Sequence, residues 1–149
     1  MATVMVDTDV YSYLASKNPT RAAPYRQHLK GHTIALSFIT VGEQYAGYLR
    51  KIARGEWNNS HLVRFEQGLR LIAIVPYDLE VCKAFGELRT LKNPDGSDRI
   101  ISTNDLWIAA CAKRHSLTLV TNNRRDFDGI PGLHIICEAP GIRSSGKKP

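Results

Sequence analysis

The chain has 149 residues, of which 43% are hydrophobic and 23% are charged, as in an ordinary globular domain. No apolar run approaches the roughly 18 residues of a membrane span. The first residues lack the basic start and long apolar stretch of a signal peptide, so we expect a cytoplasmic protein. The formal charge of +6 favours an anionic partner, nucleic acid first, although good solubility alone would also explain it.

The first half of the chain alternates short apolar runs with stretches of helical periodicity. The sequence predicts strands at 2–6, 33–38 and 69–75. It predicts helices at 9–16 with Asp9 as a candidate cap, across a segment punctuated by Pro19, Pro24 and Gly31, from Val41 to about Gly55, and at 61–68.

The second half continues the alternation. A helix capped by Asp78 is predicted to run to about Leu91, followed by a loop at 92–102, a helix from Asn104 to His115, and strands at 117–120 and 133–137. Continuously apolar strands alternating with helices predict an α/β fold, a three-layer sandwich with a mostly parallel central sheet flanked by helices. We expect one domain at 1–140 and a flexible tail at 141–149.

Three cysteines stand far apart in apolar contexts, at Cys82, Cys111 and Cys137. An odd and widely spaced set fits reduced thiols in the core better than a disulfide framework. None has a histidine or second cysteine at ligand spacing, which argues against a zinc site.

Four acidic residues fall where strands end or helices begin. Asp7 follows the first strand, Glu43 falls in the predicted first turn after the second, Asp105 opens the helix from Asn104, and Asp126 follows the fourth strand. In open α/β sheets, ligands bind beyond the carboxyl ends of the strands. Carboxylates gathered there repel one another, and hard oxygen ligands suit Mg²⁺ or Mn²⁺. The joint pattern therefore predicts a divalent-metal site.

Each acid also has a local explanation. The segment 40–43 has the spacing of a capping box, which would leave Glu43 to satisfy its own helix. Asp105 would oppose the dipole of its helix. Asp7 and Asp9 suit turns and caps, and Asp126 suits a local turn.

The order and spacing of several motifs resemble those of PIN-domain ribonucleases, and most closely the VapC-type toxins of bacterial toxin–antitoxin pairs. The resemblance runs from about Val4 to Leu133. Its marks are VDTDVYSYL at the start, ITVGEQYAGYLR around Glu43, NDLWIAACAKRHSLTLVTNN, and RRDFDGIPGL.

The resemblance implies that Asp7, Glu43 and Asp105 are the first three acids of the site. The fourth is Asp126, with Asn123 as a neutral alternative, because many PIN domains carry an aspartate at the position of Asn123.

The resemblance also implies a supporting set of residues. Thr8, Asn104 and Thr121 would orient the acids or a water, together with Asn123. Asp9 departs from the asparagine often found at its position and could add a carboxylate.

The implied activity is metal-assisted hydrolysis of RNA. Asp7 and Asp105 would hold the main metal, with Asp126 or Glu43 completing its coordination or binding a second ion. The first choices for contacts with RNA phosphates are Arg124 and Arg125. The weaker choices are Arg50, Lys51, Arg54, Lys92 and Arg99.

The implied partners are a second copy of the chain, in a homodimer, and a small VapB-like antitoxin. Such antitoxins insert a segment into the active-site groove. Apolar surface for either contact is expected from Tyr11, Tyr13, Leu14, Tyr45, Tyr48 and Leu49, although burial in the core would explain several of them equally well.

Two other functions fit part of the sequence pattern. Asp7-Thr8-Asp9 after an apolar strand also resembles the first motif of haloacid-dehalogenase-type phosphatases, in which the first aspartate is the nucleophile. That assignment leaves Glu43 and Asp105 unexplained, and no adjacent acidic pair follows Asn123. A binding module that has kept the fold and lost its chemistry is the other alternative, and four intact acids count against it.

Overall fold

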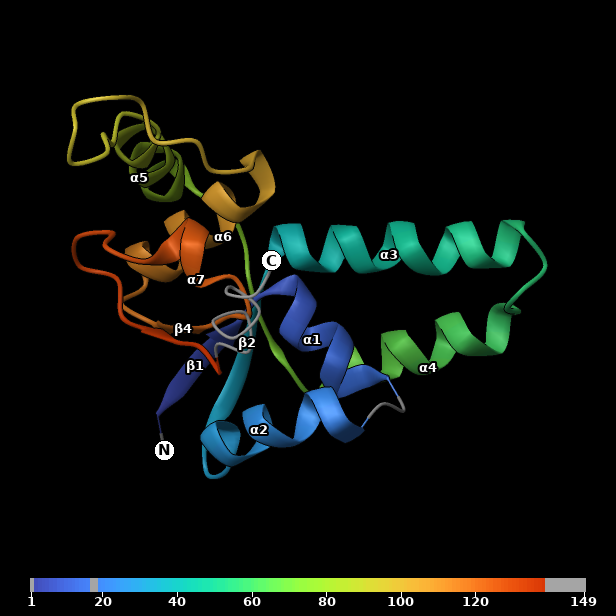
Figure 1. Cartoon of the computed structure of the whole chain (residues 1–149). Coiled ribbons are helices and arrows are strands. Elements are labelled where there is room, and N and C mark those ends of the chain that lie inside the picture. The colour runs from blue at the N-terminus through green and yellow to red at the C-terminus, as the bar shows by residue number, and fades with distance from the viewer. Residues whose placement is uncertain (1, 17–18, 139–149) are drawn as a thin grey trace, which may run out of the picture.

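The computed structural model describes residues 2–16 and 19–138. At its centre is a five-stranded sheet in the order β3-β2-β1-β4-β5, and every pair of neighbouring strands is parallel (Figure 1). The predicted parallel α/β fold is confirmed. The strands are β1 (Thr3–Val6), β2 (Thr33–Ser37), β3 (Ala73–Val75), β4 (Thr118–Val120) and β5 (Ile135–Ile136).

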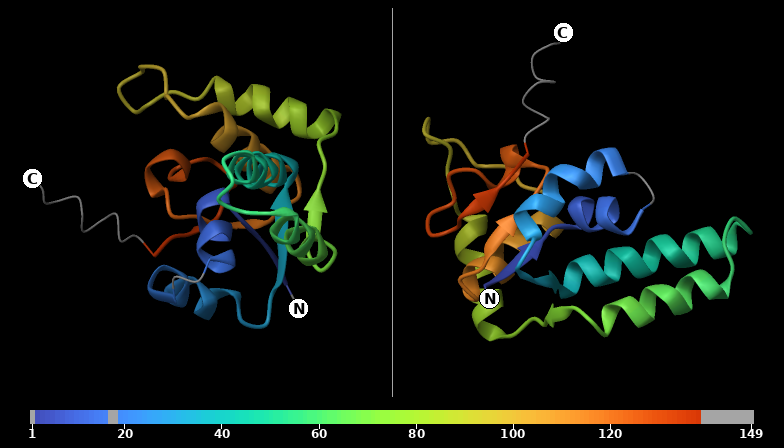
Figure 2. Two further views of the ribbon diagram at one scale, coloured as in Figure 1. Left: turned by 90° about the vertical axis from the view of Figure 1, so that its right-hand side faces the viewer. Right: turned by 90° about the horizontal axis from the view of Figure 1, so that it is seen from below.

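Helices connect these strands and cover both faces of the sheet, as Figure 2 shows. They are α1 (Thr8–Ala15), α2 (Pro19–Leu29), α3 (Phe38–Ala53), α4 (Asn59–Leu69), α5 (Leu79–Arg89), α6 (Thr103–Arg114) and α7 (Arg124–Phe127). None of the helices in the described part of the chain combines the length and apolarity needed to span a bilayer.

The core is divided in two by the sheet, as expected for three layers. Side chains alternate along a strand, so Met5 packs with buried residues of α5 and α6 on one face. Its neighbours Val4 and Val6 pack with α1, α2 and α4 on the other face. Burial on both faces explains why the strands are continuously apolar.

Helices α3 and α4 form a hairpin that extends beyond the sheet (Figures 1 and 2). Aromatic rings join the two helices. The ring of Phe65 lies 4.5 Å from that of Tyr48 and 5.1 Å from that of Tyr45, measured between centroids. This hairpin supplies one wall of a groove beside the sheet.

Two helix starts differ from the predictions. Asp7, not Asp9, caps α1 and accepts a hydrogen bond from the Val10 amide. Ser37 caps α3, so the 40–43 segment is not a capping box and Glu43 lies in the second turn rather than the first. In both places the strand passes into the helix without a loop, and the cap is the residue directly before the first helical residue.

Three other differences concern lengths and exposure. The predicted strand at 69–75 is shortened to β3 because Leu69 still belongs to α4. The single turn α7 was not predicted. Cys111 is buried as expected, whereas Cys82 is exposed. The predicted tail at 141–149 lies outside the described residues.

Candidate active site

The predicted site residues lie around the carboxyl edge of the sheet, beyond β1, β2 and β4. Asp7 directly follows β1, and residues 121–123 directly follow its neighbour β4. The amide of Asp7 donates to the carbonyl of Val120, which holds the two strand ends side by side. Segments more than a hundred residues apart in the sequence therefore meet at one place, as expected for a ligand site in a parallel sheet.

Asp7 is the most deeply buried of the acids, with 3% of its surface exposed. Its Oδ1 accepts from the Val10 amide at 2.9 Å, and its Oδ2 accepts from the Thr121 hydroxyl at 2.6 Å. Burial raises the pKa of Asp7 to about 6 in spite of these hydrogen bonds, which act in the opposite direction. The carboxylate therefore has a fixed orientation but incomplete charge stabilisation.

Asp105 begins α6 beside a second acid. Its amide donates to the Ser102 hydroxyl at 3.2 Å, and its Oδ2 accepts from the Asn123 amide group at 3.2 Å. Burial raises the pKa of Asp105 to about 7, helped by hydrogen bonding with the Asp126 side chain and by the charges of Asp126 and Asp7. Asp7, Asp105 and Asp126 therefore share one region of negative potential.

Glu43 is held next to this region through neighbours of the other acids. Its Oε1 accepts from the Thr8 hydroxyl at 2.5 Å, and its Oε2 accepts from the Asn104 amide group at 2.8 Å. Thr8 follows Asp7, and Asn104 precedes Asp105. Glu43 therefore binds the chain neighbours of Asp7 and Asp105. None of the hydrogen bonds described joins Glu43 to either of those carboxylates.

The residues predicted to support the site differ in their contacts with the acids. Thr8, Asn104, Thr121 and Asn123 each donate a hydrogen bond to one of the four acids. Asp9 is exposed, and its charge only adds to the rise in the pKa of Asp7. The location of Asp9 therefore gives no support for a fifth carboxylate in the site.

A polar network that was not predicted from the sequence lies behind Asp7. The buried Tyr25 hydroxyl donates to Asn122 Oδ1 at 2.6 Å and to the Thr121 carbonyl at 3.2 Å. Asn122 in turn donates to the Tyr13 hydroxyl at 3.2 Å. These contacts hold the segment whose Thr121 hydroxyl binds Asp7. The run of polar residues directly after β4 was the only local signal, because Tyr25 is about a hundred positions away.

The two arginines predicted to contact RNA differ in accessibility. Arg125 is exposed, whereas Arg124 is half-buried and its Nη1 lies 3.9 Å from Asp128. Among the described residues, the Arg124 Nε is buried without a hydrogen-bond partner. Both arginines begin α7, two residues or fewer from Asp126.

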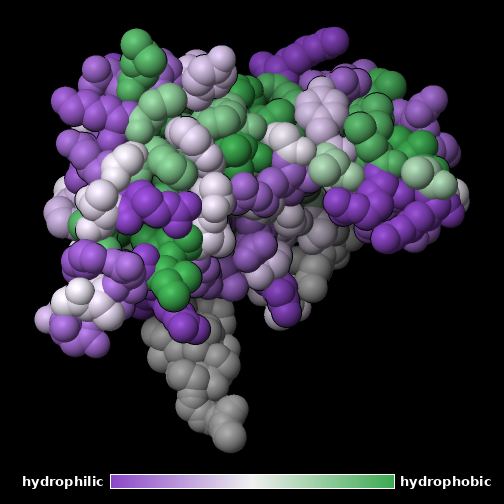
Figure 3. Space-filling view, turned by 90° about the horizontal axis from the view of Figure 1, so that it is seen from above, coloured by the Kyte–Doolittle hydropathy of each residue, from purple (hydrophilic) through white to green (hydrophobic). Residues whose placement is uncertain are grey.

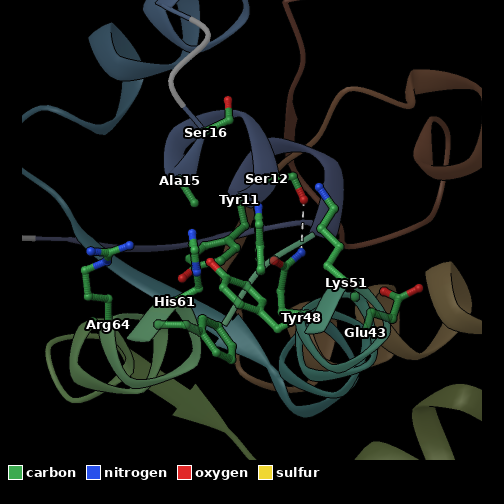
Figure 4. A pocket seen from close by; sticks show the side chains of 14 residues that line it. Tyr11, Ser12, Ala15, Ser16, Glu43, Tyr48, Lys51, His61 and Arg64 are labelled. Carbon is green, nitrogen blue, oxygen red and sulfur yellow. Dashed lines mark hydrogen bonds between the residues drawn. The ribbon is translucent and has the colours of Figure 1, made fainter. Parts of the chain in front are cut away.

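A groove of about 950 Å³ opens between α1 and the α3–α4 hairpin, and of the four acids only Glu43 lines it. Figure 4 shows Tyr11, Ser12 and Ala15 of α1 facing side chains of α3 and α4 across it. Glu43 lies at one end and Arg64 at the other. Of the apolar residues expected to form partner surface, Tyr11 and Tyr48 line this groove, whereas Tyr13, Leu14 and Tyr45 pack against the core and Leu49 is exposed.

The donor set at the sheet edge fits a divalent cation with a preference for oxygen. No ion pair of the described residues involves Asp7, Glu43, Asp105 or Asp126. Within the described chain these acids do not form a ready group of three metal ligands. Mg²⁺ ordinarily takes only one or two carboxylates and keeps several waters, so Asp7, Asp105 and Asp126 suit it without a closed protein cage.

Comparison with known proteins gives consistent results. Residues 4–133 match the family model described as PIN domain. The chain is 36% identical over 130 residues to "Ribonuclease VapC2" of Rickettsia felis, covering 87% of this chain and 92% of that protein. It is 32% identical over 128 residues to "Toxin FitB" of Neisseria gonorrhoeae, covering 83% and 90%.

A solved structure agrees with the fold. The crystal structure of VapBC2 from Rickettsia felis, bound to a DNA fragment from its promoter, superposes with a TM-score of 0.72 at 29% identity, covering 91% of this chain and 98% of that one. The family match covers most of the sequence and includes all four acids. The chain therefore belongs to the PIN-domain family.

Proposed function

We propose that this protein is a metal-dependent endoribonuclease and the toxin of a VapBC-type toxin–antitoxin pair. The observation that carries the proposal is the meeting of Asp7, Asp105 and Asp126 in one region of mutual repulsion at the carboxyl edge of the sheet. In a PIN domain that is 36% identical to a ribonuclease, the function of such a region is to hold a divalent cation against an RNA phosphate.

Asp7 and Asp105 would hold Mg²⁺ or Mn²⁺, with Asp126 or Glu43 completing the coordination. A bound ion lowers the pKa of a coordinated water and stabilises negative charge on a phosphate. The chain prepares the site by fixing its carboxylates. Thr121 and the Val10 amide fix Asp7, Asn123 orients Asp105, and Thr8 with Asn104 orients Glu43. We assign the fourth acid to Asp126, because its carboxylate is coupled to that of Asp105 by charge and hydrogen bonding, whereas Asn123 is neutral.

The basic residues nearest the acids would bind the RNA backbone. Arg125 is exposed beside Asp126 and is the first choice for a phosphate contact. A net charge of +6 over the whole chain adds long-range attraction for RNA. A cytoplasmic location, expected from the sequence, is consistent with such a substrate.

The groove between α1 and the α3–α4 hairpin is where we place the VapB-like antitoxin. Its lining is mixed, with the half-buried Tyr48 and Trp57 rings for apolar contacts and Glu43 at the end nearest the acids. A segment seated there would cover the approach to the active site. The structural relative named above is itself a complex of the two components, VapBC2.

A homodimer is the further assembly that we propose. Large exposed hydrophobic side chains cluster at the edge strand β3 and the start of α5, at Leu71, Ile74, Tyr77 and Leu79. Figure 3 shows that apolar side chains also gather in patches on the upper face of the molecule. Apolar surface of this kind on a folded domain marks an interaction site.

The test is RNA cleavage by purified protein with Mg²⁺ or Mn²⁺, followed by sequencing of new 5′ ends. The wild type is expected to cut RNA, to stop on addition of EDTA, and to regain activity when excess metal is restored. Asp7→Asn is expected to lose at least 100-fold in rate, on the order of the losses seen when an oriented catalytic group is removed. Glu80→Gln, an exposed acid in the first turn of α5, is the matched control and should cut like the wild type. Equal cutting by Asp7→Asn and the wild type would refute the proposal.

A further inference from the structure

The single turn α7 carries Asp126 but has little internal support. It spans four residues, and the Asp128 amide donates to the Arg124 carbonyl at 2.8 Å. The last four carbonyls of a helix have no hydrogen-bond partner within the helix. Because α7 has only four residues, most of its carbonyls need partners from elsewhere in the chain. The position of Asp126 must therefore be fixed from outside the turn.

Arg99 supplies that support from a distant loop. Its Nη2 donates to the carbonyl of Asp126 at 3.0 Å, of Asp128 at 2.5 Å and of Arg125 at 3.4 Å. The chain then turns at Gly129, where φ is +73° and an added Cβ would lie 3.8 Å from Arg99 Nη1. One nitrogen of the guanidinium thus lies among three carbonyls at the C-terminal end of α7, those of Arg125, Asp126 and Asp128.

The loop that carries Arg99 also leads into the helix that carries Asp105. The Arg99 amide donates to the Leu91 carbonyl at 3.2 Å, which fixes the start of the loop. At its end, Ile101 is buried in the core and Ser102 caps α6 through the Asp105 amide. The segment 99–102 therefore contacts both acids' surroundings. The Arg99 side chain binds the carbonyl of Asp126, and the Ser102 hydroxyl binds the amide of Asp105.

We propose that Arg99 is a positioning residue that sets the separation of the Asp126 and Asp105 carboxylates, and through it the affinity of the site for a divalent cation. The inference rests on the proposed metal-dependent function. The sequence placed Arg99 among the weaker candidates for contact with RNA. The structure assigns its guanidinium to backbone carbonyls, and Arg99 is half-buried.

The test measures Mn²⁺ binding by isothermal titration calorimetry, without RNA, in four proteins: the wild type, Arg99→Gln, Asp126→Asn and the double variant. Arg99→Gln should weaken Mn²⁺ binding about 10-fold, as is usual when a residue that supports a metal ligand is removed. In the Asp126→Asn background, Arg99→Gln should lower Mn²⁺ affinity by less than about 2-fold. A residue that acts through the Asp126 carboxylate has no effect once that carboxylate is removed.

The matched control is Arg89→Gln. Arg89 donates to the Ile101 carbonyl at 3.4 Å and to the hydroxyl of Thr103 at 3.2 Å, so it binds the end of the loop and the first residue of α6 but not α7, and the cap of α6 by Ser102 does not depend on it. It should leave Mn²⁺ affinity unchanged. Arg99→Lys keeps the charge and serves if the glutamine variant does not fold. It should also bind Mn²⁺ more weakly, because the lysine side chain is one bond shorter and its ammonium falls short of the position of Arg99 Nη2.

Two results would overturn the inference while leaving the proposed function intact. One is wild-type Mn²⁺ affinity in Arg99→Gln or, where that variant does not fold, in Arg99→Lys. The other is an equal fold-reduction in Mn²⁺ affinity whether or not Asp126 is present, which would mean that Arg99 does not act through Asp126. A wild-type protein that binds no Mn²⁺ and cuts no RNA would instead refute both the inference and the proposed function.

Discussion

Asp7 carries a charge that the fold keeps away from water, and the pH dependence of stability should reveal it. The pKa of Asp7 is about 6 and that of Asp105 about 7, against 3.8 for each in an unfolded chain. Between about pH 4 and pH 7 the folded state therefore binds more protons than the unfolded state. In the absence of metal, proton binding by Asp7 and Asp105 therefore stabilises the folded state as the pH falls from 7 to 4. Above pH 7 both carboxyls are ionised, and their burial lowers the free energy of unfolding.

This prediction can be checked by urea denaturation in EDTA at pH 5 and pH 8. Asp7→Asn keeps a good helix cap and removes the charge, so it should be more stable than the wild type at pH 8, and by roughly half as much at pH 5, because the unfolded Asp7 is still ionised there. The shift of Asp7 corresponds to a gain of at most about 3 kcal/mol. Mg²⁺ should stabilise the wild type at pH 8 and much less at pH 5, where protons compete for its ligands. A variant less stable than the wild type at pH 8 would contradict the assignment.

At the scale of the element, α3 offers two glycines for a test of the groove. Gly47 lines the groove and Gly42 does not, and a Cβ added at either meets no atom within 4 Å. Leucine at either position should raise the free energy of unfolding by about 0.5–1 kcal/mol, because glycine is a poor helix former. Only Gly47→Leu should weaken binding of a VapB-like antitoxin, by at least about 10-fold, on the order of 1.4 kcal/mol.

Surface plasmon resonance with immobilised antitoxin would separate the two variants. Tighter or unchanged binding by Gly47→Leu would place the antitoxin elsewhere on the protein. Equal weakening by Gly42→Leu would point to a general effect on α3 rather than to occupation of the groove.

Most elements could be predicted because their signals are local. Buried parallel strands are continuous apolar runs, and the helix at 103–114 contains a dense run of buried apolar residues at 106 and 108–112. Helix starts were misplaced by a few residues where no loop separates strand from helix, at Asp7 and Ser37. The turn α7 is too short to show any periodicity, so its existence depends on contacts that only the folded chain provides.

The site was predictable in its acids and less so in its support. Asp7, Asp105 and Asp126 stand at strand ends or helix starts, which a parallel sheet brings to one edge. Arg99 and Tyr25 act through hydrogen bonds to backbone carbonyls far along the chain. Backbone carbonyls are the same at every position, so nothing in the sequence marks which ones a side chain will bind.

At the scale of the whole molecule, the exposed apolar cluster at 71–79 predicts self-association. Leu79 is 85% exposed at the first position of α5. Leu79→Glu should shift the protein from dimer to monomer in analytical ultracentrifugation without loss of folding, because a negative charge is favourable at a helix N-terminus.

Ile100→Glu is the control, since Ile100 is 89% exposed but lies in the 92–102 loop. It should leave the dimer intact. A monomeric wild type, or a dimer that survives Leu79→Glu, would exclude this surface as the interface.

The strand order has a consequence for how the protein is made. β1 is synthesised first, yet it lies at the centre of the sheet between β2 and β4, and Thr121 follows Asp7 by 114 residues. A nascent chain still attached to the ribosome has Asp7 long before it has Asp105, Thr121 or Asp126. The proposed site is therefore assembled only after Asp126 has been synthesised and has left the ribosome, so a shorter nascent chain lacks one of the three acids that would hold the cation.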